Sequence, residues 1–114
     1  MSSSTWRLQE DYIIENLPHF YRTHLGHVPS KVCCQIMGNQ IVMTIEGVAT
    51  QPEKLLLVTD QTDMVEQFRL ELDRVLRIRL KSWITHTLDV EVLDLFLNTD
   101  LDQNRMTILV SLAQ

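Results

Sequence analysis

Basic side chains cluster around one turn near residue 26, where they could contact an anion. Arg22, His27 and Lys31 lie close together in the sequence, with His19 and His24 beside them. A phosphate group or another small anion is the ligand that such a cluster would take. The ordinary alternative is that these residues are solvated at a helix end and in a loop. A metal site is the weakest interpretation, because His19 and His24 do not share a helix face and have no paired carboxylate.

A second basic group lies between residues 69 and 81 and includes Arg69 and Arg77. It alternates with acids, which is typical of a solvated or ion-paired helix face. Contact with an acidic partner or an anionic lipid is the alternative. The formal charge of -5 and the pI near 5.2 argue against nucleic-acid binding, which needs a basic surface to neutralise phosphates.

Two acidic patterns have structural interpretations. Thr50 and Glu53 have the spacing of a helix capping box, which accounts for both residues without catalysis. Asp94, Asp100 and Asp102 lack the central glycine and the distal glutamate of a calcium loop, so we interpret them as turn formers.

The remaining reactive side chains are two adjacent cysteines. A disulfide between Cys33 and Cys34 would be strained, and no second pair completes a zinc site. We expect Cys34 to be buried and Cys33 to be partly exposed. The chain has three glycines and no phosphate-binding loop or nucleophile motif, so we expect no enzyme, no metal and no cofactor.

Helical spacing of apolar residues predicts a long central helix over residues 62–87. Arg69 and Arg77 would then lie on its opposite, charged side. A capping box predicts a short separate helix after Thr50, and Asp60 or Thr62 would cap the long helix. The predicted apolar stripe consists of Val65, Phe68, Leu72, Val75, Leu76, Leu80, Trp83 and Ile84.

The N-terminal part predicts another helix over residues 6–25 that ends at Gly26. Pro18 would bend this helix or divide it into two short ones. Residues 1–5 are expected to be frayed.

Alternating apolar residues predict two strand pairs. Residues 31–47 form a hairpin around Gly38-Asn39, with Ile36 facing Ile41 and one uniformly apolar face. Residues 89–97 and 105–112 form the second pair, and the first of these strands is apolar on both faces, as in an interior or interface strand. We therefore predict one α+β domain over residues 1–114. It would have a mainly antiparallel four-stranded sheet from two hairpins, with the long helix and the N-terminal helix packed on it.

Three stretches resemble the MpsC-like family, a small bacterial family linked by name to a sodium-translocating, membrane-potential-generating system. They are GVATQPEKLLL at 47–57, MVEQFRLELDRVL at 64–76 and DVEVLDLFLNTDLDQNRMTILVSL at 89–112. Gly47, Val48, Thr50 and Glu53 match the family pattern, whereas the turn at 26–29 lacks the family's second glycine. The resemblance implies a companion of a membrane system that acts through protein contacts, and it implies no catalytic residues.

We therefore expect a small soluble accessory or regulatory protein in the cytoplasm, acting with a membrane ion or inorganic-carbon transport system. No apolar run reaches the roughly 18 residues that span a bilayer. The doubly apolar strand at 90–97 suggests a homodimer, in addition to an unidentified, membrane-associated protein partner. The alternative is a sensor for a small anion or nucleotide, with Arg22, His27 and Lys31 at the mouth of its site.

Overall fold

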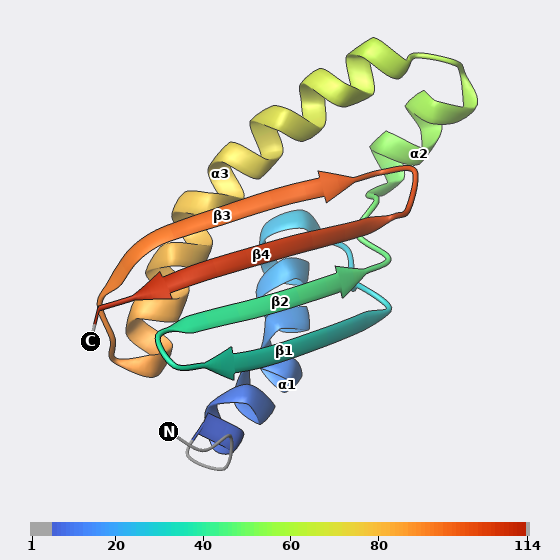
Figure 1. Cartoon of the computed structure of the whole chain (residues 1–114). Coiled ribbons are helices and arrows are strands. Elements are labelled where there is room, and N and C mark those ends of the chain that lie inside the picture. The colour runs from blue at the N-terminus through green and yellow to red at the C-terminus, as the bar shows by residue number, and fades with distance from the viewer. Residues whose placement is uncertain (1–5, 114) are drawn as a thin grey trace.

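A four-stranded antiparallel sheet forms one layer of the molecule, and helices cover one of its two faces (Figure 1). The computed structural model describes residues 6–113, so the expectation for residues 1–5 lies outside the described part. The predicted α+β fold with two hairpins is confirmed. Its elements are α1 Arg7–Leu25, β1 Lys31–Met37, β2 Gln40–Glu46, α2 Gln51–Val58, α3 Thr62–Leu88, β3 Val92–Asp100 and β4 Arg105–Leu112.

The sheet has the strand order β1-β2-β4-β3. Its first hairpin has the predicted register, with Ile36 opposite Ile41. The second pair differs from the prediction in two ways. Residues 89–91 precede β3, because Asp89 ends α3 in the left-handed conformation with φ 53°, and the strand continues to Asp100. The suggestion that this strand is interior is wrong, because β3 is an edge strand.

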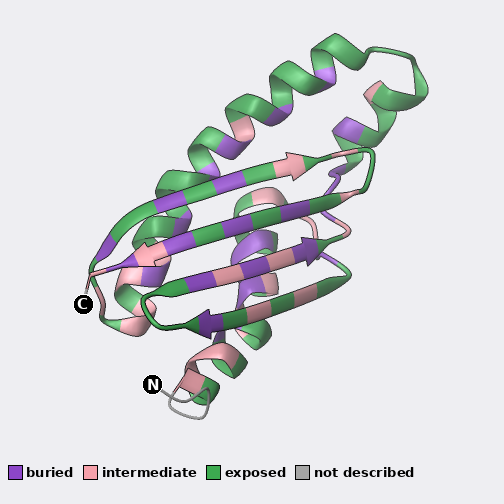
Figure 2. Ribbon diagram, viewed as in Figure 1, coloured by how far each residue is buried: buried purple, intermediate pink, exposed green. Residues whose placement is uncertain are grey.

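Burial alternates along the strands, so the sheet has one buried and one open face (Figure 2). The buried face meets α1 and the second half of α3. Cys34 is half-buried because it lies on the edge strand β1, and Cys33 is exposed as predicted. The core includes Ile36, Ile41, Met43, Ile45, Met106, Ile108 and Val110 from the sheet, with Ile13, Leu17 and Tyr21 from α1 and Leu76, Leu80 and Ile84 from α3.

Helix α1 is continuous through Pro18, so the alternative of two short helices is wrong. Proline in a helix removes one hydrogen bond and costs about 3 kcal/mol. Apolar side chains on both sides of it, including Ile13, Leu17 and Phe20, are buried and offset that cost. The helix ends at Gly26, which adopts φ 68° as predicted for a C-terminal glycine.

Helix α3 presents a different face to the core than its apolar stripe predicts. Leu76, Leu80 and Ile84 are buried as expected, but Phe68 and Val75 are 40% and 44% exposed. The helix is longer than the sheet is deep, so its first half extends past β3 and packs on α2 (Figure 1).

The buried side of that first half includes charged residues. Arg69, expected on the solvated face, is 3% exposed, and Asp73 is also buried. The expected cap is likewise wrong, because Gln61 is the N-cap of α3 and makes no side-chain cap hydrogen bond.

Candidate functional site

A buried glutamate lies at the start of α2, where the chain leaves β2. The capping box predicted for this helix is present, and it turns the Glu53 side chain back toward Thr50. Oε1 of Glu53 accepts hydrogen bonds from the backbone N–H and the hydroxyl of Thr50, both at 2.9 Å. Because Glu53 is fully buried, its charge requires a partner inside the protein.

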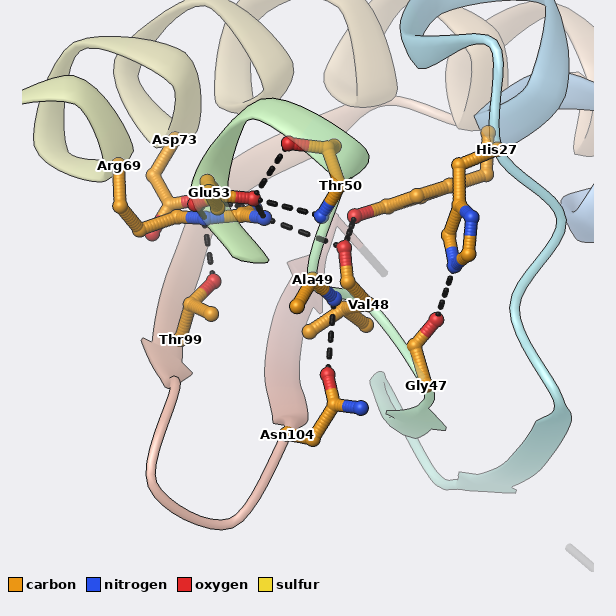
Figure 3. A network of polar contacts seen from close by, with 11 residues as sticks. His27, Gly47, Val48, Ala49, Thr50, Glu53, Arg69, Asp73, Thr99 and Asn104 are labelled. Atoms are coloured by element: carbon orange, nitrogen blue, oxygen red, sulfur yellow. Dashed lines mark hydrogen bonds and ion pairs between the residues drawn. The ribbon is translucent and has the colours of Figure 1, made fainter. Parts of the chain in front are cut away.

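Arg69 of α3 is that partner (Figure 3). Its Nε donates to Oε2 of Glu53 at 2.6 Å, and its Nη2 donates to Oε1 of the same carboxylate. Nη2 also donates to the carbonyl of Val48 at 3.2 Å, while Nη1 donates to Oδ1 of Asp73 at 3.3 Å. The two-pronged contact matches the planar guanidinium to the planar carboxylate, so α2 is held against α3 in one orientation.

Further hydrogen bonds connect Glu53, Arg69 and Asp73 to the rest of the fold. The hydroxyl of Thr99 on β3 donates to Oδ1 of Asp73 at 3.0 Å. The hydroxyl of Tyr21 on α1 donates to the same Val48 carbonyl that Arg69 contacts. We call Tyr21, Glu53, Arg69, Asp73 and Thr99 the polar clamp, because together they join α1, α2, α3 and β3.

The segment between β2 and α2 is fixed from both sides. Nε2 of His27 donates to the carbonyl of Gly47 at 2.8 Å. On the other side, the backbone N–H of Ala49 donates to Oδ1 of Asn104 at 2.8 Å (Figure 3). The N–H of Gly47 donates to the Asn104 carbonyl at 2.9 Å. Residues 47–50 therefore have little freedom, and α2 starts from a fixed position.

The ionisation of the clamp follows from burial and pairing. Burial favours the neutral form of Glu53, but hydrogen bonds from Arg69 and Thr50 outweigh it and hold the pKa of Glu53 below its ordinary value. For Asp73, burial dominates and raises the pKa above its ordinary value, although Arg69 offsets part of the effect. Burial likewise raises the pKa of the Tyr21 hydroxyl, which therefore acts as a neutral donor.

A cavity of about 420 Å³ opens beside the clamp, between the first half of α3 and the end of the β3–β4 hairpin. Arg69 and Asp73 line it, and it is also lined by Glu66, Leu70 and residues 98–102. Four of its lining residues carry carboxylates, whereas Arg69 is already paired, so the cavity suits a cationic group. Within residues 6–113, no group of three or more His, Cys, Asp or Glu side chains is arranged to hold a metal ion.

The residues expected to contact an anion or a partner are dispersed. Arg22 lies exposed in the last turn of α1, Lys31 is exposed at the start of β1, and His27 is half-buried against Gly47. Arg77 is exposed on α3. Arg69 alone enters the clamp.

Sequence reasoning missed Asp73, Thr99 and Tyr21 as members of this site. A signal for Asp73 was present, because the helical line through Val65, Leu76 and Leu80 passes through positions 69 and 73. Thr99 and Tyr21 join only through the tertiary structure.

The clamp supports an exposed apolar surface. The end of the molecule formed by α2 and the first half of α3 projects beyond β3, and most of it is exposed (Figures 1 and 2). Its large apolar side chains include Val58 at 83%, Leu70 at 68%, Leu55 at 66% and Met64 at 55% exposure. We call α2 with residues 62–75 of α3 the projecting hairpin. Such a concentration of exposed apolar side chains is typical of an interaction surface.

Comparison with known proteins gives one match. A family model described as "Na+-translocating membrane potential-generating system (MpsC)" matches residues 8–114. Neither the curated proteins nor the solved structures that were compared contain a significant match. Across residues 6–113, no helix has both the length and the apolar character needed to cross a bilayer.

Proposed function

This chain belongs to the MpsC family, and we propose that it is a non-enzymatic accessory or regulatory protein of a membrane system, working in the cytoplasm. It acts by binding another protein of that system. The family description supports the link to a membrane system that generates a potential. The observation that carries the binding role is the apolar surface of the projecting hairpin.

The polar clamp makes this surface suitable for binding. A flexible helix pair would lose conformational entropy on association, whereas a surface that is already ordered loses less. Glu53 and Arg69 lock α2 to α3, so Leu55, Val58 and Leu70 are presented on a rigid support. The clamp residues are thus assigned to positioning the surface.

The charge beside the surface defines the partner further. Leu70 belongs both to the hairpin and to the lining of the acidic cavity, where Asp102 and Glu66 are exposed. A partner segment that places an apolar side chain on Leu70 would bring its next residues to these carboxylates. The partner's contact segment is therefore apolar with a neighbouring lysine or arginine, whose charge the cavity accepts.

The test uses cells that lack the protein, with the sodium-dependent membrane potential as readout. Wild type and Ile78→Ser should restore the potential, whereas the double variant Leu55→Ser, Leu70→Ser should not. Ile78 is the matched control, because it is a 64% exposed apolar residue on α3 outside the hairpin. Equal melting temperatures of the purified variants would show that the loss is one of binding.

Three outcomes would contradict the proposal. If the double variant restores the potential fully, the projecting hairpin is not the binding surface. If absence of the protein leaves the potential unchanged under all sodium gradients, the link to the membrane system fails. Turnover of a small molecule that is abolished by Asp73→Asn would contradict the non-enzymatic role.

The basic group of the partner has its own test. With membrane vesicles from the same cells, binding of wild type should weaken as salt is raised, because exposed charge pairs are screened. Asp102→Asn should bind more weakly at low salt and show a smaller salt dependence. An unchanged salt dependence would exclude a basic group in the cavity.

A further inference from the structure

The sheet face that the helices leave open carries a band of apolar side chains across three strands. The register places Val42, Leu109 and Phe96 side by side on β2, β4 and β3. Phe96 is 58% exposed, and Leu93, at the register shift of β3 between Val92 and Asp94, is 57% exposed. Figure 2 shows that no helix lies on this side of the sheet. An open face of this kind loses solvent-exposed apolar area if a second layer packs on it.

A row of four charged residues crosses the same face near one end of the strands. The register aligns Lys31, Glu46, Arg105 and Asp100, from β1 to β2, β4 and β3 in turn. The signs alternate along the row. None of the four forms an ion pair with another residue of the described part of the chain, where the ion pairs lie among Glu53, Arg69, Asp73, Glu71 and Arg74.

Such a row is complementary to itself when it is reversed. A two-fold axis that runs parallel to the strands and lies above the open face, over the line between β2 and β4, places β2 of one copy over β4 of the other. It places Glu46 over the partner's Arg105 and Lys31 over the partner's Asp100. The same operation places Val42 over the partner's Leu109. The apolar band of one copy therefore packs on the apolar band of the other.

We propose that the open face of the sheet binds a second copy of this chain about this axis. A four-stranded face with strands of seven to nine residues measures roughly 500 Å², so the contact buries about 1,000 Å² in total. That area is at the lower end for specific complexes, so we expect a weak dimer with a dissociation constant of about micromolar order. The surface differs from the projecting hairpin. It shares Asn98 and Asp100 with the lining of the acidic cavity, but the variants that test the proposed function change neither residue, so this inference and the proposed function can fail separately.

The first test mixes two charge-reversal variants in analytical ultracentrifugation at protein concentrations from about 1 to 500 µM. Glu46→Lys alone and Arg105→Glu alone should each weaken the homodimer by about tenfold or more, because both contacts across the axis become repulsive. An equimolar mixture should dimerise nearly as well as wild type, because each contact between the two different chains is again attractive. Arg79→Glu, an exposed reversal on α3, should change nothing.

The mixture distinguishes contacts between chains from contacts within one chain. Glu46 and Arg105 are neighbours in the same sheet, and each variant keeps its internal repulsion in the mixture. Only pairing between chains can restore association. A wild-type chain that stays monomeric at every concentration, or a mixture no better than its components, would overturn the proposal.

The second test is independent of charge and uses Cys33, which is exposed on the same face. The axis places Cys33 over the partner's Asn98, while within one chain these positions lie three strands apart, at about 14 Å. Asn98→Cys should therefore give a covalent dimer with a short bismaleimide. The dimer should be lost when Cys33→Ser is added, and wild type should not cross-link. Cross-linking of wild type through Cys33 alone, or none with Asn98→Cys, would refute this axis.

Discussion

Arg69 is one cation shared by two buried carboxyl groups, Glu53 and Asp73. The guanidinium is closest to Glu53, and its contact with Asp73 is longer at 3.3 Å. Burial raises the pKa of both carboxyl groups, but at Glu53 the hydrogen bonds from Arg69 and Thr50 outweigh it, whereas at Asp73 the longer contact with Arg69 does not. At the residue scale, the contributions of Glu53 and Asp73 to the free energy of unfolding therefore change with pH in opposite directions.

Removing the cation should be severely destabilising. We expect Arg69→Met to lower the free energy of unfolding by about 3 to 5 kcal/mol, because it leaves Glu53 buried and unpaired. Arg77→Met is the matched control, since Arg77 is exposed on the same helix, and its effect should stay within about 0.5 kcal/mol. Urea denaturation monitored by circular dichroism measures both. Equal effects of the two substitutions would contradict a buried, paired Arg69.

The pH dependence of unfolding should separate the two carboxylates. Glu53 has a folded pKa below its ordinary value of 4.5, so its contribution is complete above that pH and is lost as pH falls through the folded pKa. The folded pKa of Asp73 lies above its ordinary value of 3.8, so its contribution is complete below 3.8 and is lost as pH rises through the folded pKa.

As the pH falls from about 5 to about 3, the free energy of unfolding of Glu53→Gln should therefore decrease less than that of wild type. Asp73→Asn should lose more stability, because it lacks the group that stabilises the folded state on acidification. Urea denaturation at a series of pH values measures both slopes. Parallel curves for all three proteins would show that the clamp does not control acid stability.

At the scale of elements, the junction between β2 and α2 depends on a glycine. Gly47 has φ 75°, and a Cβ there would lie 2.6 Å from Oγ and 2.9 Å from the backbone N of Ser30. Gly38, in the β1–β2 turn, has φ 60° but nothing within 4 Å of its Cβ position. Both positions have a positive φ, which strains an alanine, so they form a matched pair.

Gly47→Ala should therefore cost more than Gly38→Ala. The left-handed conformation alone costs an alanine about 1 to 2 kcal/mol, which we expect for Gly38→Ala. The clash with Ser30 adds to that cost in Gly47→Ala and displaces the start of α2. Thermal denaturation compares the two variants. A smaller loss of stability in Gly47→Ala than in Gly38→Ala would mean that the loop at Ser30 can move away from the new Cβ at no cost in free energy.

Most elements could be predicted from the sequence, because their signals are local. The hairpin register follows from the Gly38-Asn39 turn and from alternation, and Gly26 marks the end of α1. The limits of β3 could not be predicted, because Asp89 adopts an unusual left-handed conformation and the polar residues 98–100 pair with β4. Apolarity on both faces of β3 also could not distinguish an interior strand from an edge strand.

The clamp could be predicted only in part. Thr50 and Glu53 were identified as a capping box, but the same carboxylate also binds Arg69, sixteen residues away on another helix. Helical spacing predicts burial of Phe68 and Val75 only if one face of α3 packs against the same core along its whole length. At the scale of the molecule, the helix instead has two environments, the sheet for its second half and α2 for its first.

These two environments should differ in stability against local opening. The molecule measures 49 × 24 × 22 Å, and the projecting hairpin packs on few apolar side chains, whereas β2 and β4 form the centre of the core. Native-state hydrogen exchange should therefore show lower protection for the amides of α2 and the first turns of α3 than for β2 and β4. In Arg69→Met, the protection of the hairpin should fall nearly to that of an unfolded chain while the two central strands remain protected. Uniform protection of hairpin and sheet in wild type, or a loss in the variant that is equal everywhere, would mean that the molecule opens only as a whole and that the clamp does not hold the hairpin as a separate unit.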